Sequence, residues 1–176
     1  LTWYCDGSVI DGKWAAIRCA GFGIAAVSSQ GDLLAYGIGW PFSWCDTAAS
    51  AEAWVLSHCP FVPSIRTDCQ ALLTTALAGN ASATHHGRPL ARVWARIAHI
   101  VDGDIADLVS SGKVVWMPAH KTHLAIGSVH LSNGVPLSAT DWRANRLVDC
   151  LAKAAAKSLA APRDVAAFLR SADAAA

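Results

Sequence analysis

Four acidic residues stand where the surrounding pattern predicts partial burial: Asp6, Glu52, Asp68 and Asp149. A buried carboxylate is costly unless something compensates its charge. Four carboxylates at one point would raise one another's pKa, and divalent cations reverse that effect. Hard oxygen ligands suit Mg²⁺, and two ions about 4 Å apart can activate water and stabilise the leaving oxygen in a displacement at phosphorus. The sequence therefore predicts a two-metal site, provided that the elements carrying the acids converge.

Two of these acids follow predicted strands. Residues 3–5 are bulky, strand-favouring or readily buried, so residues 1–8 are predicted to form a core strand that delivers Asp6 and breaks at Gly7. Residues 61–68 are predicted to form a shorter strand that ends at Asp68, followed by a helix over 69–77. The alternative for Asp68 is a plain N-cap of that helix.

The third acid lies on a predicted helix that Asp46 and Thr47 cap and that runs to about His58. Glu52 stands at the border of its apolar stripe. It is the only glutamate in the chain, which favours a specific role. The alternative is a peripheral acid that the helix dipole favours.

The fourth acid lies on a long, alanine-rich helix predicted over 141–159 and ended by Pro162. Asn145 and Asp149 are four residues apart there, so they share one face. We expect them to face the same site as the other acids.

The remaining pattern completes one α/β domain. Strands over 20–27 and 33–38 extend the first strand into an antiparallel meander. The other expected elements are a loop over 79–87, a helix over 88–101, a strand over 113–117, a loop over 118–123, a polar segment over 125–139 and a tail with a short helical turn. Arg88, Arg92 and Arg96 share one face of the helix over 88–101; we expect a solvated face there, and the alternative is a phosphate contact. We therefore expect a five-stranded mixed sheet, three strands antiparallel and two parallel, with helices on both faces.

Composition indicates a globular chain. Its 176 residues are 53% hydrophobic and 15% charged, with net charge +1, which excludes a disordered chain. Removing the four clustered acids from the 13 leaves nine against 14 Lys and Arg, or +5 for the remaining surface. That surface is compatible with binding phosphates.

The six cysteines contain no CxxC pair, so we expect buried thiols in an intracellular protein of the cytoplasm or nucleus. No apolar run is long enough to span a membrane, and we expect no membrane partner. A chain that starts at Leu1 and holds one methionine suggests a domain of a longer polypeptide.

Five motifs, in order, resemble those of type 1 ribonuclease H, and the resemblance covers roughly residues 2 to 160. They are YCDGS (4–8), AE (51–52), RTDCQ (66–70), WMPAH (116–120) and NRLVDCLA (145–152). The resemblance implies a ribonuclease H-like catalytic domain over 1–160 with a C-terminal tail over 161–176. It also implies Mg²⁺-dependent endonucleolytic cleavage of the RNA strand of RNA–DNA hybrids, with Mn²⁺ as a possible substitute.

The same resemblance implies roles for single residues. Asp6, Glu52 and Asp68 would hold one metal ion, Asp6 and Asp149 the other, and His120 would assist turnover; His123 and His130 are rivals for that role. The substrate-binding positions it implies are Gly7 and Ser8 at the RNA strand, Thr47 at a DNA-strand phosphate, and Asn145 one helical turn before the last acid.

The sequence differs from the pattern of the family in three places. Ala48 and Ala49 replace the Asn or Gln with which family members read the minor groove, the basic handle is shortened to residues 79–87, and the loop after His120 is long. With the missing start methionine, the short handle and long loop resemble the ribonuclease H domain of a retrotransposon polyprotein, which implies a reverse transcriptase domain in the same polypeptide.

Three alternatives share the fold class. An integrase-like nuclease uses three acids, and Asp149 with Asn145 favours ribonuclease H. A proofreading exonuclease begins with a DxE strand, and Ser8 occupies the second acidic position here. A non-catalytic connector would have lost acids, and all four are present.

Overall fold

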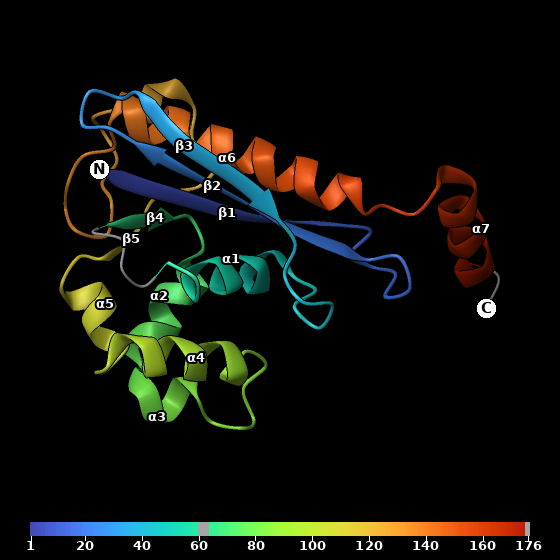
Figure 1. Cartoon of the computed structure of the whole chain (residues 1–176). Helices are drawn as coiled ribbons and strands as arrows, with labels where there is room; N and C mark the ends of the chain where they lie inside the picture. Colours follow the sequence, from blue (N-terminus) through green and yellow to red (C-terminus); the bar gives the residue numbers. More distant parts are fainter. Residues whose placement is uncertain (60–63, 175–176) are drawn as a thin grey trace.

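A five-stranded mixed sheet forms the centre of the computed structural model, which describes residues 1–59 and 64–174 (Figure 1). Its strand order is β3-β2-β1-β4-β5. The pairs β1–β2 and β2–β3 are antiparallel, whereas β1–β4 and β4–β5 are parallel. The strands are β1 (Thr2–Ile10), β2 (Cys19–Val27), β3 (Leu33–Gly39), β4 (Ile65–Thr67) and β5 (Val114–Trp116). The predicted five-stranded mixed sheet, with three antiparallel strands and two parallel ones, is confirmed.

Helices cover both faces of this sheet. The long helix α6 (Ala139–Ser158) crosses one face, and the other helices that follow β3 and precede α6 lie on the opposite side, whereas α7 stands beyond the end of the sheet (Figure 1). These other helices are α1 (Ala48–Leu56), α2 (Gln70–Leu77), α3 (Gly79–Ala83), α4 (Ala91–Val101) and α5 (Ala106–Ser110), and α7 is Arg163–Ala174.

Side chains of β1 alternate between two hydrophobic cores. Cys5 packs in the core beneath α1 and α4, together with Trp94 and Ile97. Tyr4 belongs to the core beneath α6, together with Val148. Because successive strand residues point to opposite faces, Asp6 lies on the α6 face and Gly7 on the α1 face.

Three glycines allow helices to approach the sheet closely. A Cβ on Gly7 would lie 2.1 Å from the Ala48 carbonyl oxygen of α1. Cβ atoms on Gly21 and Gly23 would lie 2.3 Å from the Ala156 nitrogen and 2.5 Å from the Val148 oxygen of α6. These positions need glycine for contact, because real side-chain atoms would collide with helix backbone.

The strand break predicted at Gly7 is therefore wrong. Residue 7 was expected to break the first strand, but β1 continues to Ile10 and pairs with β2 along its whole length. A glycine can permit either a turn or the close approach of another backbone. At Gly7 it permits the close approach of α1.

Short helices account for most of the other differences. Residues 79–87 were expected to be a loop, but their first part forms α3, and α5 was not predicted. The helix expected from Arg88 begins at Ala91, so Arg88 precedes it. The tail forms α7, a twelve-residue helix rather than a short turn. The strand predicted over 61–68 is observed as β4 (Ile65–Thr67). The first part of the prediction, residues 61–63, lies outside the described residues.

All six cysteines are free thiols; Cys5 and Cys45 are buried, and Cys150 is exposed. Among residues 1–59 and 64–174, no helix has the length and apolar character needed to cross a bilayer.

Candidate active site

Two of the four acids come from neighbouring parallel strands. Cys5 of β1 pairs with Thr67 of β4, and β4 ends there. The next residues of the two strands are Asp6 and Asp68, so the register sets them side by side. Since β4 stops while β1 continues, the sheet leaves an open edge at this point, and the two carboxylates stand beside it.

Glu52 reaches the same point from the opposite face of the sheet. Thr47 is the N-cap of α1, and its side chain accepts a hydrogen bond from the Ser50 backbone at 3.1 Å while Ser50 Oγ accepts one from the Thr47 nitrogen at 2.9 Å. This capping box fixes the start of the helix. Glu52, one turn further, is 3% exposed, so its interpretation as a peripheral acid is wrong.

Thr67 fixes the Glu52 carboxylate. Its Oγ1 donates a hydrogen bond to Glu52 Oε2 and accepts one from the Cys69 nitrogen at 3.1 Å. Helix α2 is capped at Cys69 and not at Asp68. The N-cap interpretation of Asp68 is therefore wrong, and its carboxylate remains available to the site.

Asp6, Glu52 and Asp68 form a compact cluster. One carboxylate oxygen from each lies within 4.8 Å of the others. Burial, followed by the charges of Asp68 and Asp149, raises the pKa of Asp6 to about 7. Burial also raises the pKa of Asp68, and raises that of Glu52 well above its usual value. In the described part of the chain, no Lys, Arg or His forms an ion pair with these three acids.

This donor set fits a hard divalent cation. Its donors are carboxylate oxygens from three elements that the fold already holds together, and no ion pair within the described residues offsets their mutual repulsion. Mg²⁺ and Mn²⁺ prefer such oxygen ligands. The cluster could therefore bind a metal ion.

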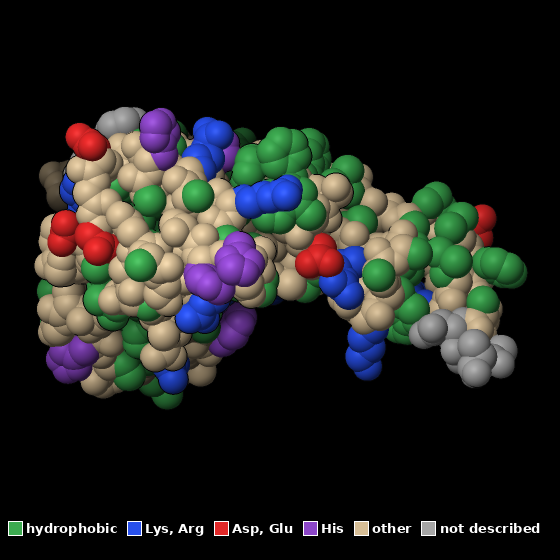
Figure 2. Space-filling model, turned by 90° about the horizontal axis from the view of Figure 1, so that it is seen from below, with side chains coloured by type: hydrophobic (Ala, Val, Ile, Leu, Met, Phe, Trp, Pro, Cys, Tyr) green, Lys and Arg blue, Asp and Glu red, His purple; other side chains and the backbone are tan. Residues whose placement is uncertain are grey.

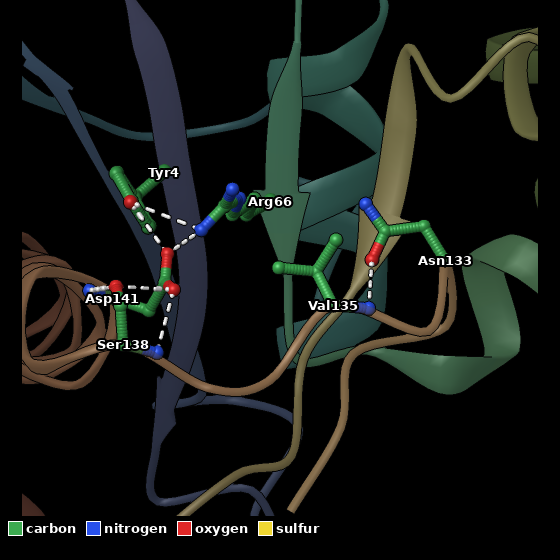
Figure 3. A network of polar contacts seen from close by, with 6 residues as sticks. All are labelled: Tyr4, Arg66, Asn133, Val135, Ser138 and Asp141. Carbon is green, nitrogen blue, oxygen red and sulfur yellow. Dashed lines mark hydrogen bonds and ion pairs between the residues drawn. The ribbon is translucent and has the colours of Figure 1, made fainter. Parts of the chain in front are cut away.

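Helix α6 carries polar residues at four-residue spacing across the site. The first, Asp141, belongs to a buried network (Figure 3). Its carboxylate accepts a hydrogen bond from Tyr4 Oη at 2.7 Å, forms an ion pair with Arg66, and accepts a hydrogen bond from the Ser138 nitrogen at 3.0 Å. This network ties the start of α6 to β1 and β4, and so sets where the next turns lie.

The next two turns place Asn145 and Asp149. Asn145 Nδ2 donates to Asp68 Oδ2 at 3.2 Å. Asp149 lines the same pocket as the three clustered acids, and its Oδ2 accepts from Lys153 Nζ at 2.7 Å. Asp149 therefore lines the pocket, but it is not one of the three acids whose oxygens lie within 4.8 Å of one another, and a lysine already pairs with it.

His120 stands at the rim of this pocket. It lines the pocket together with Asp6, Asp68 and Asp149, and its charge acts to lower the pKa of Asp68. Its φ is 49°, a left-handed conformation that is uncommon for a non-glycine residue. Of its two rivals, His123 lies in the 3-10 helix η1 (His123–Ala125), and His130 forms an isolated bridge with Pro136.

The predicted substrate-binding residues lie around the pocket in different ways. Gly7 and Ser8 line it. Thr47 is exposed, but its hydroxyl caps α1.

Sequence reasoning missed the positioning residues Thr67, Tyr4, Arg66 and Asp141. For Asp141 a signal existed, because Ser138 followed three residues later by an acid is typical of a helix start.

A basic groove lies on the helical side of the molecule. It has a volume of about 550 Å³, and Trp44, His86, Arg88 and Arg92 are among its lining residues. Figure 2 shows this side of the protein, where His, Lys and Arg side chains gather over the helical layer. The row of arginines was expected to be a solvated face, and two of its members line this groove.

Comparisons with known proteins add little to this geometry. No family model matches the sequence, and no curated protein does. Among solved structures, the chain is similar to an RNase H1 isolated from compost by a metagenomic approach, with 17% identity and a TM-score of 0.49. The match covers 88% of this chain and 96% of that one.

Proposed function

We propose that this chain is an endoribonuclease that hydrolyses the RNA strand of RNA–DNA hybrids with divalent metal ions, Mg²⁺ or Mn²⁺. The observation that supports it most is the convergence of Asp6, Glu52 and Asp68 within 4.8 Å, in a pocket that Asp149 and His120 also line. The choice of a hybrid substrate comes from the resemblance of the five sequence motifs.

Different residues of the chain would bind the metal ions, orient the carboxylates and transfer a proton. Asp6, Glu52 and Asp68 would hold one ion, and Asp6 with Asp149 a second. Ions bound there would supply water activation and charge stabilisation at the scissile phosphate. Thr67 orients Glu52, and Asn145 orients Asp68. The exposed imidazole of His120 would take up or release a proton at a ring nitrogen.

Substrate binding would use two surfaces, the carboxylate pocket and the basic groove of the helical layer. Gly7 and Ser8 would approach the RNA strand, since both line the pocket. The groove with Trp44, Arg88 and Arg92 combines cations with an aromatic ring, which suits a nucleic-acid backbone. We propose that the DNA strand passes there.

The polypeptide context is proposed on the sequence resemblance alone. A retrotransposon polyprotein would place a reverse transcriptase domain in the same polypeptide, and that domain would supply the hybrids.

A cleavage assay tests the proposal. The purified protein is offered an RNA–DNA hybrid labelled on either strand, beside double-stranded DNA, double-stranded RNA and single strands, with Mg²⁺ or EDTA. We expect internal cuts in the RNA strand of the hybrid, in Mg²⁺ only. Asp6→Asn should abolish them while circular dichroism stays native, and the exposed Asp107→Asn should cut normally. An uncut hybrid, or an active Asp6→Asn protein, would refute the assignment.

A further inference from the structure

A second cleft opens beside the carboxylate pocket. It lies between the segment after β5 and helix α6, has a volume of about 240 Å³, and shares His120 and Asp149 with that pocket. Trp142 links its two sides, because its Nε1 donates to the Lys121 carbonyl at 2.8 Å. The cleft is therefore a neighbour of the proposed cutting site, built from the same loop and helix.

Two cations without ion-pair partners line this cleft. Lys121 and Arg146 are both exposed, and neither forms an ion pair within the described residues. The guanidinium of Arg146 lies 5.0 Å from the centre of the Trp142 ring. At this distance the ring attracts the guanidinium and restricts where it lies, and the N–H groups of an arginine can still bind an anion.

Lysine already compensates the acid that this cleft contains. Asp149 accepts from Lys153 at 2.7 Å. The charge that remains for a ligand is therefore positive, and it comes from opposite sides of the cleft. A phosphate fits this arrangement, since Arg binds it through paired N–H groups and Lys as a point charge.

Asn145 supplies a second, independent observation. It lines the cleft and is 9% exposed. Its Nδ2 donates to Asp68, while its Oδ1 is buried and has no hydrogen-bond partner in the part of the chain that the structure describes. A buried acceptor without a donor is uncommon in folded proteins. A ligand hydroxyl or water in the cleft would reach this oxygen once the Asn145 side chain turns toward the cleft that it lines.

The size of the cleft limits what enters. Its volume of about 240 Å³ gives room for a group of the size of a phosphate. One strand of a duplex would pass its backbone here while its bases stay paired outside.

We propose that the cleft between Lys121 and Arg146 binds a phosphate of the strand being cut, next to the scissile phosphate. The identity of the polymer rests on the proposed function. The cleft would hold the RNA strand in register over the carboxylates, through its backbone and without reading its sequence.

Binding of a labelled RNA–DNA hybrid, measured by fluorescence anisotropy in EDTA, separates this proposal from catalysis. Arg146→Gln and Lys121→Gln should each weaken binding several-fold and flatten the dependence of log K on log salt by about 0.7 to 0.9, the slope of one phosphate contact. Lys157→Gln is the matched control, because it removes one exposed cation from α6 about 16 Å further along the helix and should change the slope least.

A hybrid that carries one neutral methylphosphonate locates the contact. When the methylphosphonate is moved along the RNA strand, it should weaken binding to the wild-type protein at one position near the cut. At that position, the Arg146→Gln variant should lose little further affinity. Such non-additivity is the signature of a direct contact. Unchanged affinity and slope in both cleft variants, or additive losses at every position, would overturn the proposal. Failure of wild-type cleavage in Mg²⁺ would instead count against the proposed function.

Discussion

Asp6 carries a carboxylate where the fold leaves it 6% exposed and beside two other acids. Its pKa rises from 3.8 to about 7, and at ~1.4 kcal/mol per pKa unit this corresponds to roughly 4 kcal/mol. That free energy opposes folding when Asp6 is charged. Asp6→Asn removes the charge at nearly constant shape, so it should stabilise the metal-free protein by up to about 4 kcal/mol. For a chain of this size the melting temperature should rise by roughly 8 to 16 °C.

The stabilisation of the metal-free protein by Asp6→Asn should increase with pH. Below about pH 4, Asp6 is protonated in both the folded and the unfolded chain, and the variant should gain nothing. As the pH rises from 4 to 7, the unfolded chain loses its proton first, so wild-type stability falls by ~1.4 kcal/mol per pH unit. Above pH 7 the full difference is reached. The contribution of a protonated Asp6 to stability is thus lost as the pH rises through its folded pKa.

Urea unfolding of wild type and Asp6→Asn in EDTA, at intervals from pH 4 to pH 8.5, measures this difference. Asp107→Asn, which neutralises an exposed acid outside the pocket, should stay within about 0.5 kcal/mol of wild type throughout. If Asp6→Asn is no more stable than wild type at pH 8, or if its gain is the same at pH 4, then the acids do not repel one another as the geometry requires.

Three further changes test other parts of the site. Mg²⁺ at ten times its Kd should stabilise wild type by roughly 1.4 kcal/mol, and melting curves of Asp68→Asn should show a smaller rise; equal responses would refute a metal cluster. Asp141→Ala should lower the free energy of unfolding by about 3 to 5 kcal/mol, because it leaves Arg66 without its buried partner, and a loss below 1 kcal/mol in urea would contradict the network. His120→Ala should slow hybrid cleavage by on the order of 10²-fold or less, whereas His123→Ala should leave it unchanged; the reverse order would assign the role to His123.

The acids were predictable because each follows from a local pattern. Asp6 and Asp68 end or follow apolar strand segments, and Glu52 and Asp149 lie on helices whose periodicity is clear. These patterns, with the order of the motifs, were enough to predict one mixed sheet and its convergence point. These local patterns can be recognised without knowing which side chains are in contact in the folded protein.

The side chains that contact these acids were not predictable, because those contacts depend on how distant elements of the chain pack together. Thr67 and Arg66 lie within a strand of three residues, where no periodicity can show which face each occupies. Whether Thr67 meets Glu52, and whether Arg66 meets Asp141, depends on where α1 and α6 dock on the sheet. The five-residue helices α3 and α5 were missed because a single turn has little intrinsic preference to detect.

The docking of α6 on the first strand also sets when the pocket is completed during synthesis. Tyr4 and Asp141 are hydrogen-bonded across 137 positions of the chain, and Asp149 follows two turns later. A ribosome adds residues in order, so Asp6, Glu52 and Asp68 have left it long before α6 exists. Until then the α6 face of the sheet has no long helix on it, and the pocket lacks its fourth acid. Translation that stops before residue 139 would therefore release a chain that holds three of the carboxylates and has no helix to fix Asp68 or to bring in the last one.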